Sequence, residues 1–155
     1  MYELSKKMIL KCIPENFPLE YNLFHGTNQD SIKSIIRGGF NRSYCGKNGT
    51  AYGQGVYFAR DAAYSDKYSK AQTYPIIHRQ PNLIYPMSNN INLSMILARV
   101  LVGIYQKGSP DMKDTAMRDD HSQYESTVDN VHNPTIFVIY KDFRAYPNYI
   151  INYTS

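Results

Sequence analysis

The sequence predicts an α+β fold in which antiparallel-rich β-sheets, split at the centre, are flanked by short helices. Apolar runs typical of buried strands occur early and late in the chain, at residues 21–24, 95–103, 136–140 and 149–153. Segments with helical spacing of apolar residues lie among them. The regular alternation of strand and helix that a doubly wound parallel sheet requires does not occur. The length of 155 residues suits one domain.

The first expected elements surround the strand at residues 21–24. Apolar residues at helical spacing predict a leading helix at 4–12, which the following prolines interrupt. A second helix should begin after the strand, where Asn28 or Asp30 can cap it. It ends at a glycine pair, 38–39. Its apolar residues are expected to share one packed face: Ile32, Ile35 and Ile36.

The middle of the chain alternates between loops and short elements. Residues 41–55 are rich in glycine and polar residues, which indicates a loop that approaches a ligand closely. A short strand at 56–59 and a helix at 60–69 follow. Residues 71–92 contain scattered prolines and are expected to form an irregular insertion. The polar segment 107–131 contains no motif that predicts a specificity.

The composition excludes several classes of protein. With 43% hydrophobic and 19% charged residues, the chain should fold, and no apolar run is long enough to span a bilayer. The N-terminus does not resemble a signal peptide. Two cysteines, Cys12 and Cys45, do not build a disulfide framework, so an intracellular location, cytoplasmic or nuclear, is expected. The histidines lack metal-ligand spacing, so no metal is expected: His25, His78, His121 and His132.

Four stretches carry the functional signal. They are Leu-Phe-His-Gly-Thr at 23–27, Asn-Arg-Ser-Tyr-Cys-Gly-Lys-Asn-Gly at 41–49, Gly-Gln-Gly-Val-Tyr-Phe-Ala at 53–59 with two Tyr-Ser pairs after it, and Ile-Phe-Val-Ile-Tyr at 136–140. In this order they resemble the catalytic domain of the poly(ADP-ribose) polymerase family, and most closely its macrodomain-associated mono-ADP-ribosyltransferase branch. The resemblance implies an ADP-ribosyltransferase fold, with a short lead-in at 1–20 and the catalytic domain at 21–155.

The resemblance also implies an NAD site. His25 and Tyr57 match the first two members of the family's His-Tyr-Glu triad, and His25 would bind the adenosine ribose. The backbone of Gly26 and the hydroxyl of Ser65 would hold the nicotinamide carboxamide. Tyr57 and Tyr68 would stack on the cationic ring, whereas Tyr64 is expected to be structural. Further NAD contacts are expected from Thr27, Asn41, Arg42 and Ala59.

The third triad position departs from the polymerase pattern, because Ile136 stands where the family has its glutamate. An isoleucine neither accepts a hydrogen bond nor takes a proton. Polymer synthesis should therefore be lost. Transfer of one ADP-ribose can survive, since nicotinamide leaves as a neutral molecule and a carboxylate on the target can supply the missing charge.

Three interpretations remain open at this stage. The chain is either a mono-ADP-ribosyltransferase or a catalytically silent module that binds NAD or ADP-ribose or acts as a scaffold. The formal net charge of +4 lends slight support to nucleic acid as the acceptor. The expected partners are NAD and acceptor proteins, the chain itself among them, with no membrane.

Overall fold

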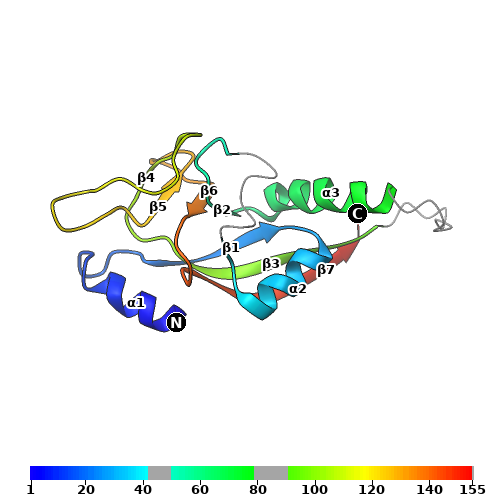
Figure 1. Cartoon of the computed structure of the whole chain (residues 1–155), viewed down its shortest axis with the longest axis horizontal. Helices are drawn as coiled ribbons and strands as arrows, with labels where there is room; N and C mark the ends of the chain where they lie inside the picture. Colours follow the sequence, from blue (N-terminus) through cyan, green and yellow to red (C-terminus); the bar gives the residue numbers. More distant parts are fainter. Residues whose placement is uncertain (42–49, 79–90, 155) are drawn as a thin grey trace.

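The computed structural model describes residues 1–41, 50–78 and 91–154. Its described strands form one mixed sheet of seven in the order β4-β5-β6-β2-β1-β3-β7 (Figure 1). Neighbouring strands of this sheet pair antiparallel, except for β4 with β5, which are parallel. The elements in chain order are α1 (Tyr2–Leu10), β1 (Glu20–Gly26), α2 (Gln29–Gly38), β2 (Val56–Ala59), α3 (Ala62–His78), β3 (Asn92–Leu101), β4 (Tyr105–Lys107), β5 (Ser126–Val128), β6 (Ile136–Ile139) and β7 (Ala145–Thr154). The expected α+β class is confirmed.

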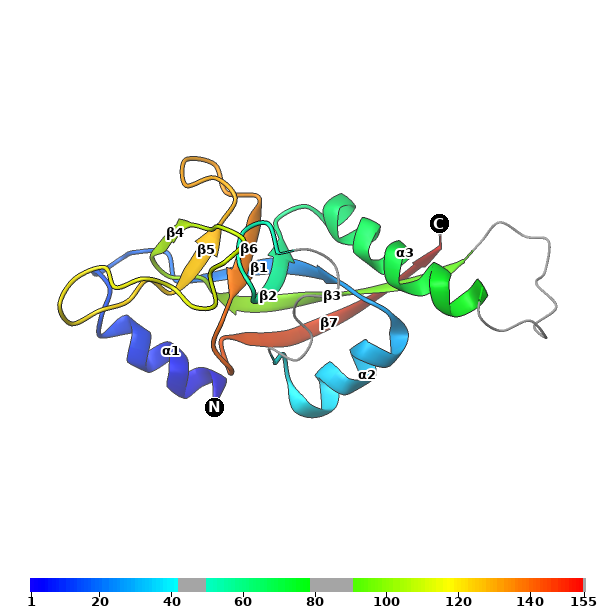
Figure 2. The same ribbon diagram turned by 45° about the horizontal axis from the view of Figure 1, so that its top comes forward.

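The sheet has two halves, and they meet at one point. Strand β1 pairs with β2 only through Phe24 and Ala59, whereas it pairs with β3 along its whole length. This junction is where the predicted split lies. Helices α3 and α2 lie on opposite sides of β1, β3 and β7 (Figures 1 and 2).

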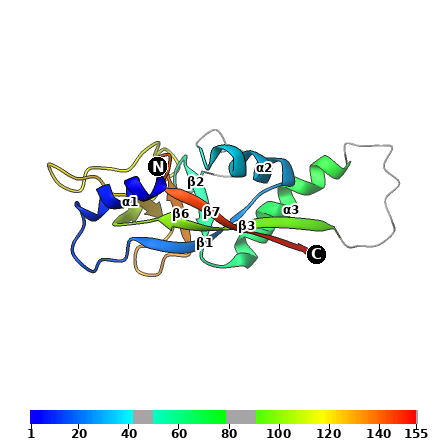
Figure 3. The same ribbon diagram turned by 90° about the horizontal axis from the view of Figure 1, so that it is seen from below.

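Two groups of buried apolar residues hold the fold together. The larger joins α2 to the sheet and includes Ile35 and Val100. The smaller joins α1 to the next residue of β3, Leu101. Successive residues of a strand point to opposite faces, so β3 contributes to both groups. Seen from below, α1 and α2 lie near different parts of the sheet, with the start of β7 between them (Figure 3).

The second helix begins and ends as its sequence predicts, but its packed face is narrower. Asn28 caps it, because its side chain accepts a hydrogen bond from the backbone N–H of Ser31 at 2.8 Å. It is followed by Gly39, whose φ of 79° suits glycine. Ile32 and Ile35 are buried. The expectation that Ile36 joins them is wrong, because this side chain is 52% exposed on the neighbouring side of the helix.

Regular structure occurs in the segment that was expected to be irregular, 71–92, and in the polar segment for which no element was predicted, 107–131. Helix α3 continues to His78, because a proline within a helix removes one donor without necessarily ending it. The remainder of the predicted insertion, 79–90, lies outside the described residues. The polar segment 107–131 includes β5, which pairs in parallel with β4. Each of these strands has three residues, too few for a periodic signal.

The last strand begins before the proline that was expected to precede it. Pro147 lies within β7, next to the point where the register with β3 shifts between Leu97 and Ala98. Strand β7 is at the edge of the sheet. A proline is tolerated there because its missing N–H interrupts no interior ladder.

Candidate functional site

The junction of the half-sheets brings the expected triad positions together. Ala59 pairs with Phe24 of β1 on one side and with Ile136 of β6 on the other. His25 directly follows Phe24, and Tyr57 lies two residues before Ala59 on β2. Residues from three strands that are far apart in the sequence therefore meet at the junction of the half-sheets.

His25 is held in a defined tautomer by its surroundings. Its Nδ1 lies 2.7 Å from the carbonyl oxygen of Tyr57, and a carbonyl can only accept, so Nδ1 carries the proton. The ring packs against Phe40 and Phe58, with centroids 5.2 and 5.5 Å away. Burial lowers the pKa of His25, although the hydrogen bond to Tyr57 opposes the shift. The imidazole is therefore neutral at pH 7, and Nε2 has a lone pair that can accept a hydrogen bond.

Gly26 provides a close approach between β1 and α3. A Cβ atom at this position would lie 1.9 Å from the carbonyl oxygen of Ser65, so no residue with a side chain fits without moving the backbone. Ser65 is buried, with 2% of its surface exposed. The two residues that the resemblance assigns to the nicotinamide carboxamide are thus adjacent in the structure.

Two tyrosines of α3 form a pair one turn apart. The hydroxyls of Tyr64 and Tyr68 lie 2.9 Å from each other, and their rings are tilted by 54° with centroids 5.2 Å apart. Burial and the hydrogen bond to Tyr68 raise the pKa of Tyr64, and the nearby phenols of Tyr52 and Tyr57 add to the shift. Tyr64, which was expected to be structural, therefore orients Tyr68 and belongs to a cluster of phenols.

The Tyr57 hydroxyl is fixed by the turn that precedes β2. It donates to the carbonyl oxygen of Gly53 at 2.7 Å and accepts from the backbone N–H of Tyr52 at 3.0 Å. The carbonyl oxygen of Tyr52 accepts in turn from the hydroxyls of Thr127, at 2.8 Å, and Tyr140, at 3.2 Å. The hydroxyl oxygens of Thr127 and Tyr140 lie 2.8 Å from each other. This network locks the Tyr57 ring in place.

Sequence reasoning missed this network. Gly53 is its clearest signal, because its φ is 129° and a Cβ there would lie 1.7 Å from the Tyr140 hydroxyl. The glycine was assigned to a loop that approaches a ligand. In the structure, it makes room for Tyr140, which directly follows β6.

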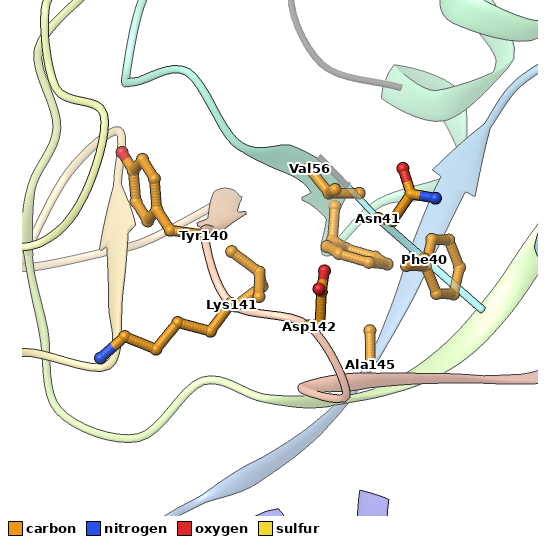
Figure 4. Close-up of a pocket in the computed structure, with 9 residues that line it drawn as sticks. Phe40, Asn41, Val56, Tyr140, Lys141, Asp142 and Ala145 are labelled. Carbon is orange, nitrogen blue, oxygen red and sulfur yellow. The ribbon is translucent and has the colours of Figure 1, made fainter. Parts of the chain in front are cut away.

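The structure describes three of the four other residues that were expected to contact NAD. Thr27 and Ala59 are buried, with 3% and 1% of their surfaces exposed. Asn41 is half-buried and lines a small cavity beside Phe40 and Asp142 (Figure 4). The volume of this cavity is about 10 Å³, the space of one water molecule, so it does not accommodate a nucleotide. Arg42 lies outside the described residues.

Ile136 is a buried strand residue, with 6% of its surface exposed. Its backbone N–H donates to Oδ1 of Asp129 at 3.1 Å, and the backbone N–H of Thr135 donates to the same oxygen at 2.9 Å. Burial raises the pKa of Asp129, but the hydrogen bonds from Thr135 and Ile136 outweigh it and lower the pKa overall. This carboxylate is ionised and fixes the start of β6.

Comparisons with known proteins now decide the family. Residues 5–127 match the sequence profile described as the poly(ADP-ribose) polymerase catalytic domain. The chain belongs to this family. Among its relatives is the mouse protein named "Protein mono-ADP-ribosyltransferase PARP12", which is 38% identical over 138 residues, covering 88% of this chain and 17% of that protein.

Two further relatives carry names of the same kind. "Protein mono-ADP-ribosyltransferase PARP10" of mouse is 36% identical over 154 residues, covering 97% of this chain and 14% of that protein. "Protein mono-ADP-ribosyltransferase PARP14" of Homo sapiens is 38% identical over 139 residues, covering 86% and 7%. The chain thus spans less than a fifth of the length of each of these relatives.

The part of the chain that matches the family does not include the third triad position. The family match ends at Thr127, within β5, and β6 lies beyond it. The position of Ile136 beside Ala59 is a finding of the sheet register. Within the described residues, no three His, Cys, Asp or Glu side chains lie close enough to hold a metal ion. No helix in the described part of the chain is long and apolar enough to cross a membrane.

Proposed function

We propose that this chain is an NAD-dependent mono-ADP-ribosyltransferase, which transfers one ADP-ribose from NAD to a side chain of an acceptor protein and releases nicotinamide. The observation that carries the proposal is the register of β6. Beside Ala59, at the junction of the half-sheets, the strand presents the buried apolar Ile136 where a polymerase of this family has a carboxylate. The names of the relatives support the same reaction.

The donor half of the site is suited to NAD. The Nε2 lone pair of His25 can accept a hydrogen bond from a ribose hydroxyl, since Nδ1 is committed to the carbonyl of Tyr57. The phenol rings of Tyr57 and Tyr68 offer apolar faces with negative electrostatic potential, which attract a flat cation such as the nicotinamide ring. The hydrogen bonds of Tyr57 and Tyr68 hold both rings before any ligand arrives. Preorganisation of this kind lowers the cost of binding.

Single transfer requires no base at position 136. The bond between the ribose C1′ and the nicotinamide nitrogen breaks, and its electron pair stays with nicotinamide, which becomes neutral. A new bond then forms between C1′ and a carboxylate oxygen of the acceptor. An ionised carboxylate has no proton to lose, so the step balances without a general base.

Chain elongation has a different requirement. The nucleophile would then be a ribose hydroxyl, which is weak until a positioned base takes its proton. Ile136 has no group that can accept one. Asp129 is not a substitute, because its oxygens are engaged by the backbone and the hydroxyl of neighbouring residues.

The proposal is tested with the purified chain, an acidic acceptor protein and NAD that is radiolabelled in its adenosine half. We expect label on protein, equimolar release of nicotinamide, and loss of both in His25→Ala. His132→Ala is the matched control, since His132 is an exposed loop histidine, and it should retain full labelling. If NAD binds to the wild-type chain by calorimetry but neither label nor nicotinamide appears with any acceptor, the chain is a silent binding module and the proposal is wrong.

A further inference from the structure

Exposed apolar side chains gather at one place outside the candidate NAD site. A hollow of about 650 Å³ lies where the start of α1, the end of α2 and the start of β7 meet. Several large apolar residues that line it are strongly exposed: Met1 (71%), Ile36 (52%), Phe143 (49%) and Tyr146 (46%). Concentrated apolar exposure of this kind marks interaction surfaces more often than isolated exposed residues do.

Arg99 of β3 lies within this hollow. Its guanidinium carbon lies 5.2 Å from the ring centroid of Tyr2 and 5.0 Å from that of Tyr146. The two rings, one from α1 and one from β7, restrict the guanidinium by cation–π contact. Arginine, tyrosine, phenylalanine and methionine are also the residue types that are enriched at protein interfaces.

The polar atoms of this arginine are incompletely paired. Its Nε is buried and has no hydrogen-bond acceptor among the described residues. Its ion-pair partner Glu3 approaches Nη1 only to 3.7 Å, beyond the usual range of a hydrogen bond. The side chain of Glu3 is 64% exposed and that of Arg99 is 32% exposed. An exposed pair with this separation contributes little, so Glu3 can be displaced.

We propose that this hollow is a docking site for an acidic peptide segment of a partner protein, in which an Asp or Glu is flanked by apolar side chains. The carboxylate would replace Glu3 and form a charge-assisted pair with the guanidinium of Arg99. The flanking side chains would cover the exposed surfaces of Ile36, Phe143 and Tyr146. Arg99 and Glu3 carry the charged side chains among the residues that line the hollow, and the α-amino group of Met1 adds a second positive charge. An acidic group therefore matches the site.

Docking here would leave the candidate NAD site accessible. The residues that line the hollow belong to α1, α2, β3, β7 and the segments next to them. His25, Tyr57, Tyr68 and Ile136 are not among them. The site can therefore be tested by binding alone, and the result does not depend on whether the chain transfers ADP-ribose.

The test uses the whole chain and two fluorescein-labelled peptides, acetyl-Ala-Leu-Phe-Glu-Leu-Ala-amide and its counterpart with Gln in place of Glu. Fluorescence anisotropy should show the Glu peptide binding at least about 10-fold more tightly than the Gln peptide. The NMR signal of the Arg99 Nε–Hε pair should shift on addition of the Glu peptide. Equal affinities, or shifts confined to other surfaces, would overturn the proposal.

Two substitutions should change the binding of the Glu peptide in opposite directions. Arg99→Lys should remove most of the preference for Glu over Gln, because lysine lacks the planar fork of the guanidinium. Glu3→Gln should tighten binding of the Glu peptide roughly two- to five-fold, because the internal competitor is gone. Arg60→Lys, at the exposed ion pair of Arg60 with Asp61, is the matched control and should change nothing. If Arg99→Lys fails to fold, the Glu3→Gln result decides, and unchanged or weaker binding there contradicts the proposal.

Two other occupants are separated by the same experiment. Inorganic phosphate is added in molar excess over the Glu peptide. Full displacement of the peptide would show a small oxyanion pocket rather than a peptide site. Sedimentation shows whether the chain is instead a dimer. If the NMR signal of Arg99 is then already at its shifted position without peptide, the hollow belongs to a second copy of the chain. Either result would overturn the proposal of a partner peptide.

Discussion

The candidate NAD site and the hollow beside Arg99 are built from similar residues but differ in how these residues are paired. At the NAD site, the His25 Nδ1, the Tyr57 hydroxyl and the Tyr68 hydroxyl each have a partner within the protein. In the hollow, Tyr2 and Tyr146 hold Arg99, yet its Nε has no acceptor among the described residues. Internal pairing fixes the side chains of the first site before any ligand arrives. The incomplete pairing of Arg99 supports the proposal of a peptide partner for the second.

The largest effect should come from breaking the close approach at the NAD site. Gly26→Ala places a Cβ 1.9 Å from the Ser65 carbonyl oxygen, so β1 and α3 must separate. We expect NAD-dependent labelling to fall by at least about 100-fold, because displacements of about 1 Å in a catalytic site have effects of that size.

Gly38→Ala is the matched control for this substitution. Gly38 is helical, and its added Cβ meets nothing within 4 Å. It should raise the free energy of unfolding by about 0.5–1 kcal/mol and leave labelling intact. Equal activities of the two variants would show that the contact between Gly26 and Ser65 is not part of the site.

The second prediction uses neighbouring residues of α2 that belong to different environments. Both residues line the hollow, but Ile35 is packed in the core with 0% of its surface exposed, whereas Ile36 is 52% exposed. Ile35→Ala should lower the free energy of unfolding by about 2–5 kcal/mol, and Ile36→Ala should change it by less than about 0.5 kcal/mol. Urea denaturation measures both. Ile36→Ala should instead weaken binding of the Glu peptide, and a large loss of stability in this variant would contradict its assignment to an open surface.

A smaller loss of stability and activity is expected when the hydrogen-bond network that holds Tyr57 is changed. Tyr140→Phe removes the hydroxyl that contacts Thr127 and the carbonyl of Tyr52. We expect a loss of about 1 kcal/mol in the free energy of unfolding, together with a lower kcat and weaker binding of benzamide, a nicotinamide mimic. Tyr149→Phe, at an exposed tyrosine of β7, is the control. A Tyr140→Phe variant with unchanged benzamide affinity would show that the network does not position Tyr57.

The smallest effect is a dependence of stability on pH. Burial lowers the pKa of His25 from its ordinary value of 6.5. As the pH falls below 6.5, the unfolded chain binds the proton first, so the free energy of unfolding declines. The lowered pKa of Asp129 adds a further decline below its ordinary value of 3.8. Thermal unfolding between pH 8 and 5 should show the first decline, which His132→Ala should keep and His25→Gln should remove.

The sequence predicts those parts of the fold that depend on local pattern. Strands β2 and β6 consist of apolar residues and are mostly buried, so their composition alone indicates interior strands. Strands β4 and β5 have three residues each and owe their existence to their mutual pairing, which periodicity cannot detect. The periodicity of α2 places Ile36 near the apolar face but does not show how far the sheet covers that face.

In the candidate site, too, local sequence pattern predicts some features, whereas others depend on the whole fold. Motifs identify His25, Gly26 and Tyr57, and the strand register then brings Ile136 beside Ala59. The hydrogen bonds of Thr127 and Tyr140 to Tyr52 join residues that are 75 and 88 positions apart. Contacts over such separations depend on the complete fold, so no local pattern announces them. The contact between Tyr64 and Tyr68 differs, because residues four positions apart on a helix lie on the same face, and this spacing is visible in the sequence.

The central claim is that Ile136 restricts this chain to the addition of a single ADP-ribose, and the length of the product tests it most directly. The chain is incubated with radiolabelled NAD and an acidic acceptor protein, and the protein-bound label is cleaved and resolved by size. The account predicts one ADP-ribose unit per modified site, both for the wild-type chain and for the conservative variant Ile136→Val. A ladder of longer products from the wild-type chain would contradict it.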